Sequence, residues 1–516
     1  MSWKLLYFVN FVIVLCFLII WTGASRSPLA DEIHDQANLS HKDLAGINLR
    51  EANLNQSILS YSMLNHSDLS HAYLISSWLK CADLSHATMI GTNLKMTYLC
   101  DSDLSHADLS YANMWGCCLE GAVLTQAKLV HANLSFANIK DIDLSEADLS
   151  GADLTGSVIS RTKFVDAKLK QANMTSVLMT AVDLTRADLS EAQLSNAHMS
   201  GAKLLGAYLV DSDLTNAVLN DADLSYANLA GARLVSTHLS GANMSGIYLQ
   251  NVNAFEADLS WTNLTNSHLS NGIFVWAILN GADMSGADLC ESDFSRAAMM
   301  RSIFREADLR NSSFAYADLT EADMGGADLS GAIFDQACLR RSNFKEARLN
   351  NASIIGTDLE EADFSGAVII GVKIQDTNLT KTNLAGTQMS GIILEDCIVR
   401  ETPMKRADLS KANISGIDFE DTDLREANLS GANGRYMILR NANLSSANLR
   451  GADIRSILIE SADLRGANLS GAEYDDFTLQ QISMAVSRGA LNLEGAIIGE
   501  DMKAKLEAMR HKYSSG

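Results

Sequence analysis

From Leu39 to Leu469, every fifth residue is leucine or another large apolar residue, and this register is broken only at Ala254 and Gly434. An amphipathic helix would place apolar residues at i, i+3 and i+4, and a half-buried strand would alternate them strictly. A period of five fits neither pattern. The chain therefore requires a third geometry over most of its length.

The same short grammar surrounds each apolar centre, as in Ala82-Asp83-Leu84-Ser85. The small residue two positions before the centre should point the same way as the centre, because residues i and i+2 share a face of an extended segment. Asp or Asn before the centre, Ser or Thr after it and a frequent Gly beyond suit tight turns. We therefore expect each pentapeptide to form one short strand and a corner.

This grammar resembles the A-[DN]-L-[ST]-x motif of the pentapeptide-repeat proteins. The resemblance implies an all-β solenoid, a right-handed quadrilateral parallel β-helix with four pentapeptides per coil, so that residues 20 apart stack on each other. We expect one β-helix over 37–474 with about 22 coils, which at a strand spacing of ~4.8 Å would be roughly 100 Å long.

Columns of residues spaced by 20 support this coil length. One column alternates in charge, as expected if like charges on neighbouring strands are unfavourable, and reads Arg301, Glu321, Arg341, Glu361, Lys381, Glu401. Another predicts an aromatic ladder inside the core and contains Phe274, Phe294, Phe314 and Phe334. The weakest repeats lie at Ala254, Gly434 and residues 372–402, where we expect local bulges or kinks.

The N-terminal segment, residues 1–24, is different in character. Residues 5–21 form an uncharged apolar run with Trp3 and Trp21 at its ends, which predicts an apolar helix that anchors the chain in a membrane. Residues 25–36 would be a short linker. A signal peptide removed after export is the competing interpretation, because small residues follow the run.

The charges on either side of the apolar run differ. Lys4 precedes it, whereas Asp31, Glu32 and Asp35 follow it closely. This bias favours a single-pass protein with its N-terminus inside and its solenoid outside the cytoplasm.

The C-terminal segment, 475–516, loses the fivefold pattern. Residues 478–487 and 500–512 each read as a short helix. A helical cap would cover the apolar core and unpaired strand edges of the last coil. Homodimerisation through this cap is the alternative, because the resemblance includes proteins that dimerise at their C-terminal ends.

The chain is acidic, with 62 Asp and Glu against 40 Lys and Arg and a net charge of −22. This excess would repel phosphate, so we expect no direct binding to nucleic acid. The resemblance to quinolone-resistance proteins implies a different role, in which an acidic solenoid imitates duplex DNA and occupies a type II topoisomerase. Many of the acidic residues, however, are the turn Asp of the repeat, and an exported solenoid would not meet a cytoplasmic topoisomerase.

Exposed aromatic and basic side chains are the candidates for binding an unknown protein partner. Trp78 and Tyr98 should stack on adjacent coils, and one column places Arg296 between two aromatic residues. Basic residues of the same region would either pair with carboxylates on neighbouring coils or form a docking face for an acidic partner. The predicted partner-binding residues are Trp78, Tyr98, Trp276, Arg296, Tyr316, Arg301 and Arg341.

Three histidines share one predicted column on consecutive coils. His66, His86 and His106 would chelate a divalent metal or repel one another when protonated, but the column lacks an obvious fourth ligand. Solvated surface histidines are the competing interpretation. We assign no metal site with these residues and expect no cofactor.

No catalytic constellation is present in the sequence. It has no Gly-rich phosphate loop, nucleophile elbow or metalloprotease helix, and no insertion between 39 and 469 to build a pocket. We therefore predict a non-enzymatic structural or protein-binding solenoid, tethered to a membrane. DNA mimicry and a metal- or pH-responsive surface protein are the alternatives.

Overall fold

The computed structural model describes residues 35–489 and 491–513. The chain divides into two compact units, 1–253 and 254–516, and the division falls at Ala254. The expectation of about 22 coils in a single stack is therefore not supported. The apolar helix expected at 5–21 lies outside the described residues, and among those described no helix is long and apolar enough to cross a membrane.

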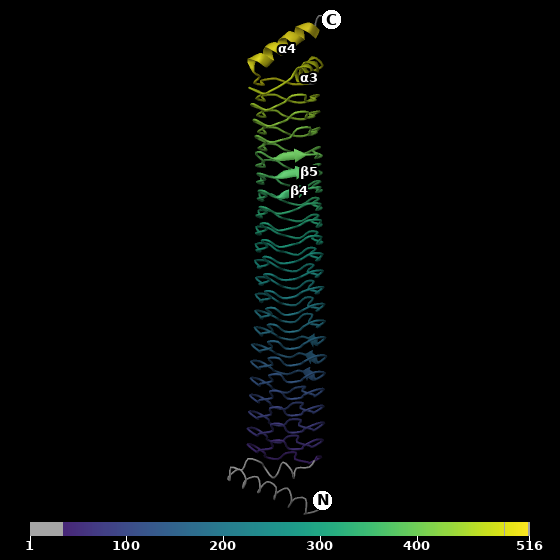
Figure 1. Cartoon of the computed structure of the whole chain (residues 1–516), viewed down its shortest axis with the longest axis vertical. Coiled ribbons are helices and arrows are strands. Elements are labelled where there is room, and N and C mark those ends of the chain that lie inside the picture. The colour runs from purple at the N-terminus through teal and green to yellow at the C-terminus, as the bar shows by residue number, and fades with distance from the viewer. Residues whose placement is uncertain (1–34, 490, 514–516) are drawn as a thin grey trace, which may run out of the picture. The chain divides into compact units, whose positions relative to one another are not determined.

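Each unit is a β-solenoid in which the chain pairs with itself in parallel every 20 residues. Asn38 pairs with Ile58 in the first unit, and Asp258 pairs with Ile278 in the second. The predicted coil of four pentapeptides is thus confirmed. Figure 1 shows these coils stacked within each unit.

Only a few segments pair over three residues and form named strands. In the first unit β1 (Asn138–Lys140), β2 (Val158–Ser160) and β3 (Leu178–Thr180) form one parallel sheet. In the second unit β4 (Ser353–Ile355), β5 (Lys373–Gln375) and β6 (Ile393–Glu395) form another. The register is again 20 residues, as in the pairing of Ile374 with Leu394.

Hydrogen bonds explain why the chain turns every five residues. The amide of Leu84 donates to Asp103 O on the next coil (2.7 Å), and the amide of Ala87 donates back to Leu84 O (3.0 Å). The second bond closes a four-residue turn whose third residue, His86, has φ +56°. A positive φ at this place is that of a type II turn and explains why Gly is frequent two residues after each centre.

The turn also explains the polar residues of the repeat. Asp83 Oδ1 accepts hydrogen bonds from the amide (3.0 Å) and the hydroxyl (2.6 Å) of Ser85. Asp or Asn before the centre and Ser or Thr after it are therefore a local hydrogen-bonded pair. A Ser that replaces the inward Ala is also satisfied, since Ser102 Oγ donates to Leu99 O at 2.6 Å.

The core consists of the central apolar residue and the small residue two positions before it. Leu84 and Ala82 are both buried, as are their equivalents along each unit. The predicted aromatic ladder is confirmed in the second unit, where the rings of Phe274 and Phe294 stack at 4.8 Å with planes 10° apart. Phe314 stacks at 5.4 Å on Phe294 and at 5.1 Å on Phe334.

The weak repeats keep the normal register and are not bulged. The amide of Ala254 donates to Ile273 O (2.7 Å), and that of Gly434 donates to Asp453 O (2.9 Å). At Gly434 a Cβ atom would lie 2.4 Å from Cε of Met437, which is buried at a position usually held by Ala. A large side chain thus occupies the space that the missing leucine leaves. Between 372 and 402, β5 and β6 pair without a slip.

Two helices close the second unit, as predicted, and stand beyond its last coils in Figure 1. They are α3 (Asp476–Ser487) and α4 (Glu500–Tyr513). Asp475 caps α3 by accepting a hydrogen bond from the Thr478 amide (2.8 Å). Burial raises the pKa of Asp475, but hydrogen bonds from the Thr478 backbone and from Ser456 outweigh this and hold it well below its usual range.

The solenoid resumes after α3. Asn492 pairs with Asp463, and Ile497 pairs with Asn468, each 29 residues apart instead of 20. Asn492 Oδ1 accepts from the Glu494 amide (3.0 Å), as the turn Asp of any repeat does. The helix α3 is thus inserted into the last coil, and the sequence analysis missed the two pentapeptides that follow it.

Candidate protein-interaction surfaces

Outward side chains come from two positions of each pentapeptide. The residue before the centre lies on a flat face, and the residue two after it lies at a corner with positive φ. Trp78 and Tyr98 are face residues, whereas Arg296 is a corner residue. Equivalent residues on successive coils lie at strand spacing, so side chains 20 apart in sequence can stack.

The first unit carries the largest group of stacked aromatic residues among the candidates. The Trp78 and Tyr98 rings stack with centroids 4.3 Å apart, and 49% of Trp78 is exposed. Ile58 precedes them in the same column and is also exposed. The predicted contact between Trp78 and Tyr98 is therefore confirmed.

More apolar side chains lie at the corner that leads into this face. Met96 and Phe136 are exposed, and the Trp115 ring lies 6.1 Å from the Phe136 ring. Lys95 Nζ lies 4.7 Å from the Trp115 ring centroid, within cation–π distance. The sequence analysis did not single these residues out, although their spacing of about 20 along adjacent columns was available. We call the following set the first-unit aromatic patch: Ile58, Trp78, Met96, Tyr98, Trp115 and Phe136.

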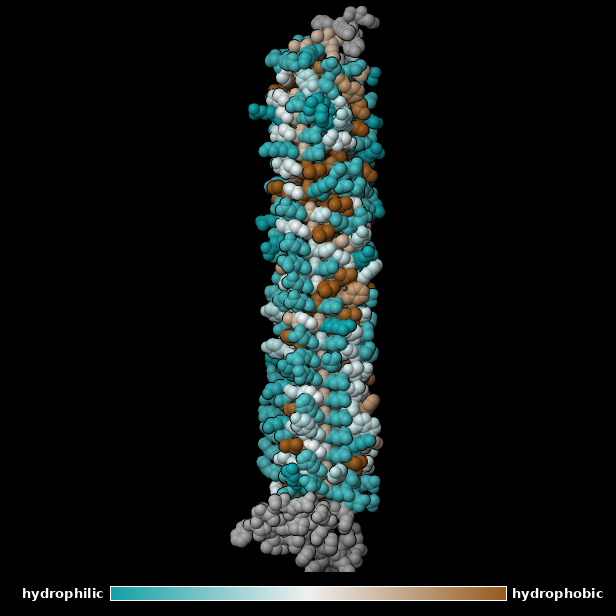
Figure 2. Space-filling view, viewed as in Figure 1, coloured by the Kyte–Doolittle hydropathy of each residue, from teal (hydrophilic) through white to brown (hydrophobic). Residues whose placement is uncertain are grey.

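In the second unit the predicted column places a cation between two rings. The guanidinium carbon of Arg296 lies 5.2 Å from the Trp276 ring centroid and 4.9 Å from that of Tyr316. All three are corner residues, with φ between 61° and 63°. We call these three residues the arginine sandwich. In Figure 2 apolar side chains, drawn in brown, gather in small groups on an otherwise hydrophilic face.

Arg301 and Arg341 are in a different situation because each is ion-paired. Arg301 bonds to Glu321, and Arg341 bonds to Glu361, each at 2.8 Å. The hydrogen bond and charge of Glu361 raise the pKa of Arg341. The ion-pairing interpretation of these two residues is confirmed, as is the alternation of charge along their column.

Other basic residues of the region also pair with nearby carboxylates. The pairs include Arg305 with Asp323 (2.6 Å), Arg310 with Asp308 (2.6 Å) and Lys345 with Asp363 (3.2 Å).

The three histidines stack on one another. The His66 and His86 rings lie 4.9 Å apart, and the His86 and His106 rings lie 4.6 Å apart, with planes within 8°. Parallel stacked rings direct their nitrogen lone pairs side by side and not toward one point. Across residues 35–489 and 491–513, no group of three or more His, Cys, Asp or Glu is arranged to hold a metal ion.

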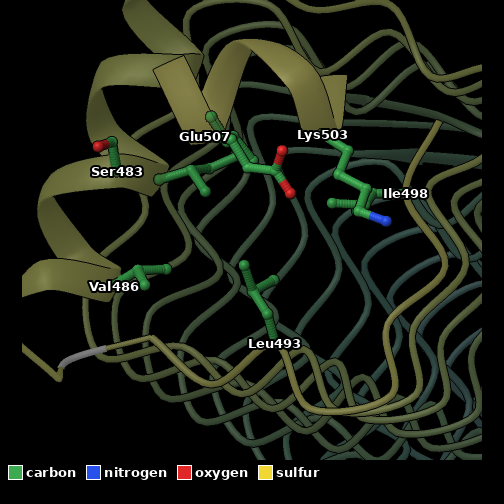
Figure 3. A pocket seen from close by; sticks show the side chains of 8 residues that line it. Ser483, Val486, Leu493, Ile498, Lys503 and Glu507 are labelled. Carbon is green, nitrogen blue, oxygen red and sulfur yellow. The ribbon is translucent and has the colours of Figure 1, made fainter. Parts of the chain in front are cut away.

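A pocket of about 220 Å³ lies between α3, α4 and the resumed coil. In Figure 3, Val486 and Leu493 form part of its wall, while Lys503 and Glu507 project from α4 toward the opening. Leu493 and Ile498 are central residues of their pentapeptides and would be buried in a regular coil, but both are half-buried here. The pocket is therefore the place where α4 covers the last coil incompletely.

Comparison with known proteins supports a repeat architecture over most of the chain. No curated protein matches the sequence. A family profile described as pentapeptide repeats, in eight copies, matches it many times, at residues 35–70, 67–105, 107–145, 137–175, 178–216, 202–241, 217–253, 232–271, 257–296, 274–305, 302–341, 342–380, 404–433 and 438–473.

The chain is similar to several solved structures. A pentapeptide repeat protein from the Arabidopsis thaliana thylakoid lumen is 36% identical over 18% of this chain, which spans 65% of that protein's length (TM-score 0.18). HetL, involved in heterocyst differentiation regulation in the cyanobacterium Nostoc, is 28% identical over 58% of this chain and 90% of its own (TM-score 0.11). QnrB1, a plasmid-mediated fluoroquinolone resistance protein, is 21% identical over 39% and 96% (TM-score 0.15).

Proposed function

The chain belongs to the pentapeptide-repeat family, and from that premise we propose that it is a non-enzymatic solenoid that binds another protein. The observation that carries the proposal is the first-unit aromatic patch. Trp, Tyr and Met are enriched at protein interfaces and Trp and Tyr dominate hot spots, because they bury a large area with few rotatable bonds. A soluble surface seldom leaves such side chains grouped without a use.

The backbone beneath the patch supports this function. Trp78 and Tyr98 are held at strand spacing by parallel pairing, and each already stacks on the other. Their rotamer freedom is therefore restricted before a partner arrives, which reduces the entropic cost of association. A solenoid also presents its contacts along an extended surface, in contrast to the concave pocket that small-molecule chemistry requires.

We test this function by photo-crosslinking in the native cell. A benzophenone amino acid at position 58, beside Trp78, should give a discrete adduct with a partner protein. The change Trp78→Ala should remove the adduct, because it deletes the central ring of the patch. Tyr208→Ala is the matched control, since Tyr208 is also an exposed face residue, 52% accessible, outside the patch. Equal adduct yield from both variants would contradict the proposal.

We further propose that residues 5–21 tether the solenoid to a membrane, with the repeats outside the cytoplasm. Support comes from the uncharged apolar run, its terminal Trp residues and the acidic residues that follow. Fractionation combined with protease protection tests both parts. Repeats recovered in the soluble cytoplasmic fraction would refute the tether.

DNA mimicry is tested separately. The likeness to QnrB1 is one of fold alone, and no contact described above favours this alternative. Inhibition of gyrase supercoiling by the purified chain would support it.

A further inference from the structure

Arg296 differs from the neighbouring basic residues in what surrounds it. The two faces of its guanidinium are covered by Trp276 and Tyr316, at 5.2 Å and 4.9 Å. The coil repeat accounts for this fit, because rings two coils apart are ~9.6 Å apart, which leaves room for one planar group between them. The side chain is therefore held flat, with its N–H donors directed outward in the plane of the guanidinium.

Those donors have no partner among the described residues. Arg301, Arg305 and Arg310 each lie within 2.8 Å of a carboxylate oxygen, whereas Arg296 forms no ion pair or hydrogen bond through its side chain in the described part of the chain. An uncompensated, oriented cation is unusual in a protein with a net charge of −22. The planar edge of a guanidinium matches a carboxylate, to which it donates two parallel hydrogen bonds.

Apolar side chains surround the sandwich. Ile273 and Ile278 are exposed on the two faces that meet at the Trp276 corner. Across the second face, at the next corner, Trp261 is 65% exposed and Met300 is 42% exposed. An approaching segment would therefore find one cation and an apolar surface beside it, and Trp, Tyr and Arg are the residue types that dominate interface hot spots.

From these observations we propose that the arginine sandwich is a docking site for a partner segment that carries a carboxylate next to an apolar side chain. The site rests on the proposed protein-binding function and adds the chemistry of the partner. A carboxylate fits better than a phosphate ester, because phosphate sites use clusters of unpaired cations. Here the neighbouring arginines, such as Arg301, are already neutralised by carboxylates.

The test uses an array of random 12-residue peptides in which each acidic peptide has a twin with Asp and Glu replaced by Asn and Gln. The full chain is the probe, and dissociation constants of the strongest binders are then measured by fluorescence anisotropy. We expect the amide twins to bind about tenfold more weakly or worse, as for loss of a charge-assisted hydrogen bond.

Variants of Arg296 give the decisive comparison. R296Q should weaken the acidic peptides by a similar factor and abolish the difference between twins. R296K should also weaken them, because lysine keeps the charge but lacks the planar edge. R348Q is the matched control, since Arg348 is exposed and forms no ion pair among the described residues. Arg296 lies at the surface, so an unchanged circular dichroism spectrum should accompany each variant.

The outcomes separate this site from the proposed function. If the binders respond to R348Q as strongly as to R296Q, or if no peptide depends on both its carboxylate and Arg296, the sandwich is not a carboxylate site. Loss of the adduct at position 58 on Trp78→Ala would then still support protein binding through the first-unit aromatic patch. Conversely, carboxylate-dependent peptide binding with an unaffected adduct would retain the sandwich and reject the patch.

Discussion

The aromatic ladder of the second unit allows a prediction in which only stacking is removed. Phe314 stacks on Phe294 and on Phe334 and contacts the edge of Phe304 at 6.1 Å. The change Phe314→Leu introduces the residue that most repeats carry at this central position. Burial and backbone fit are therefore largely retained, while two stacked contacts are lost.

The expected magnitude follows from the number of rings in contact. A well-placed aromatic pair contributes about 0.5–1.5 kcal/mol beyond its buried area. Phe314→Leu should thus lower local stability by about 1–3 kcal/mol more than Phe164→Leu, which changes a buried Phe with no ring contact among the described residues. Phe274→Leu, which loses one stacked pair, should be intermediate.

The assay is native-state hydrogen exchange of the amides between residues 294 and 334. A local probe is needed because the stability of a solenoid is a sum over neighbouring coils, and a single global midpoint would dilute the effect. The order Phe314, Phe274, Phe164 from largest to smallest loss is expected. Equal losses in all three variants would refute the assignment of stabilisation to stacking and would leave only the change in side-chain volume.

The other predictions concern the corners, the cap and the histidine column. Gly201→Ala should lower the free energy of unfolding by about 1 kcal/mol through its positive φ alone, whereas Gly281→Ala should lower it further, because the new Cβ would lie 2.4 Å from the Trp261 ring; urea unfolding and Trp fluorescence would show this, and equal losses would contradict it. Asp475→Ala should loosen α3 by about 1 kcal/mol in hydrogen exchange. Because the pKa of Asp475 is depressed in the folded state, its contribution is present above about pH 4 and lost as the pH falls further, so the variant should lack this acid-dependent loss. In a zinc titration the thermal midpoint of His86→Ala should follow that of the unchanged chain, and a zinc-dependent difference would revive the metal interpretation.

The sequence was sufficient to predict the coil and most of its stacking. Residues 20 apart share a column, so the Trp78–Tyr98 pair and the surroundings of Arg296 followed from spacing alone. The sequence was less informative where the geometry of a side chain matters. It placed His66, His86 and His106 in one column, but only the orientation of their rings distinguishes stacking from chelation. It also did not predict that Met437 fills the space at Gly434.

The C-terminal end shows the same limit. Both helices were predicted from their patterns, but the two pentapeptides after α3 were not, because a single pair of repeats is too short to stand out as a period. Their pairing with Asp463 and Asn468 depends on α3 leaving the coil and returning to it.

The amino-acid sequence by itself determined the fold class, because a five-residue period repeated over most of the chain specifies the same strand and corner redundantly. Tertiary structure alone decided which outward side chains matter, because partners are set by contact between coils. Arg301 and Arg296 occupy equivalent corner positions and have the same charge. One is neutralised by Glu321, whereas the other lies between two rings with its donors unpaired among the described residues.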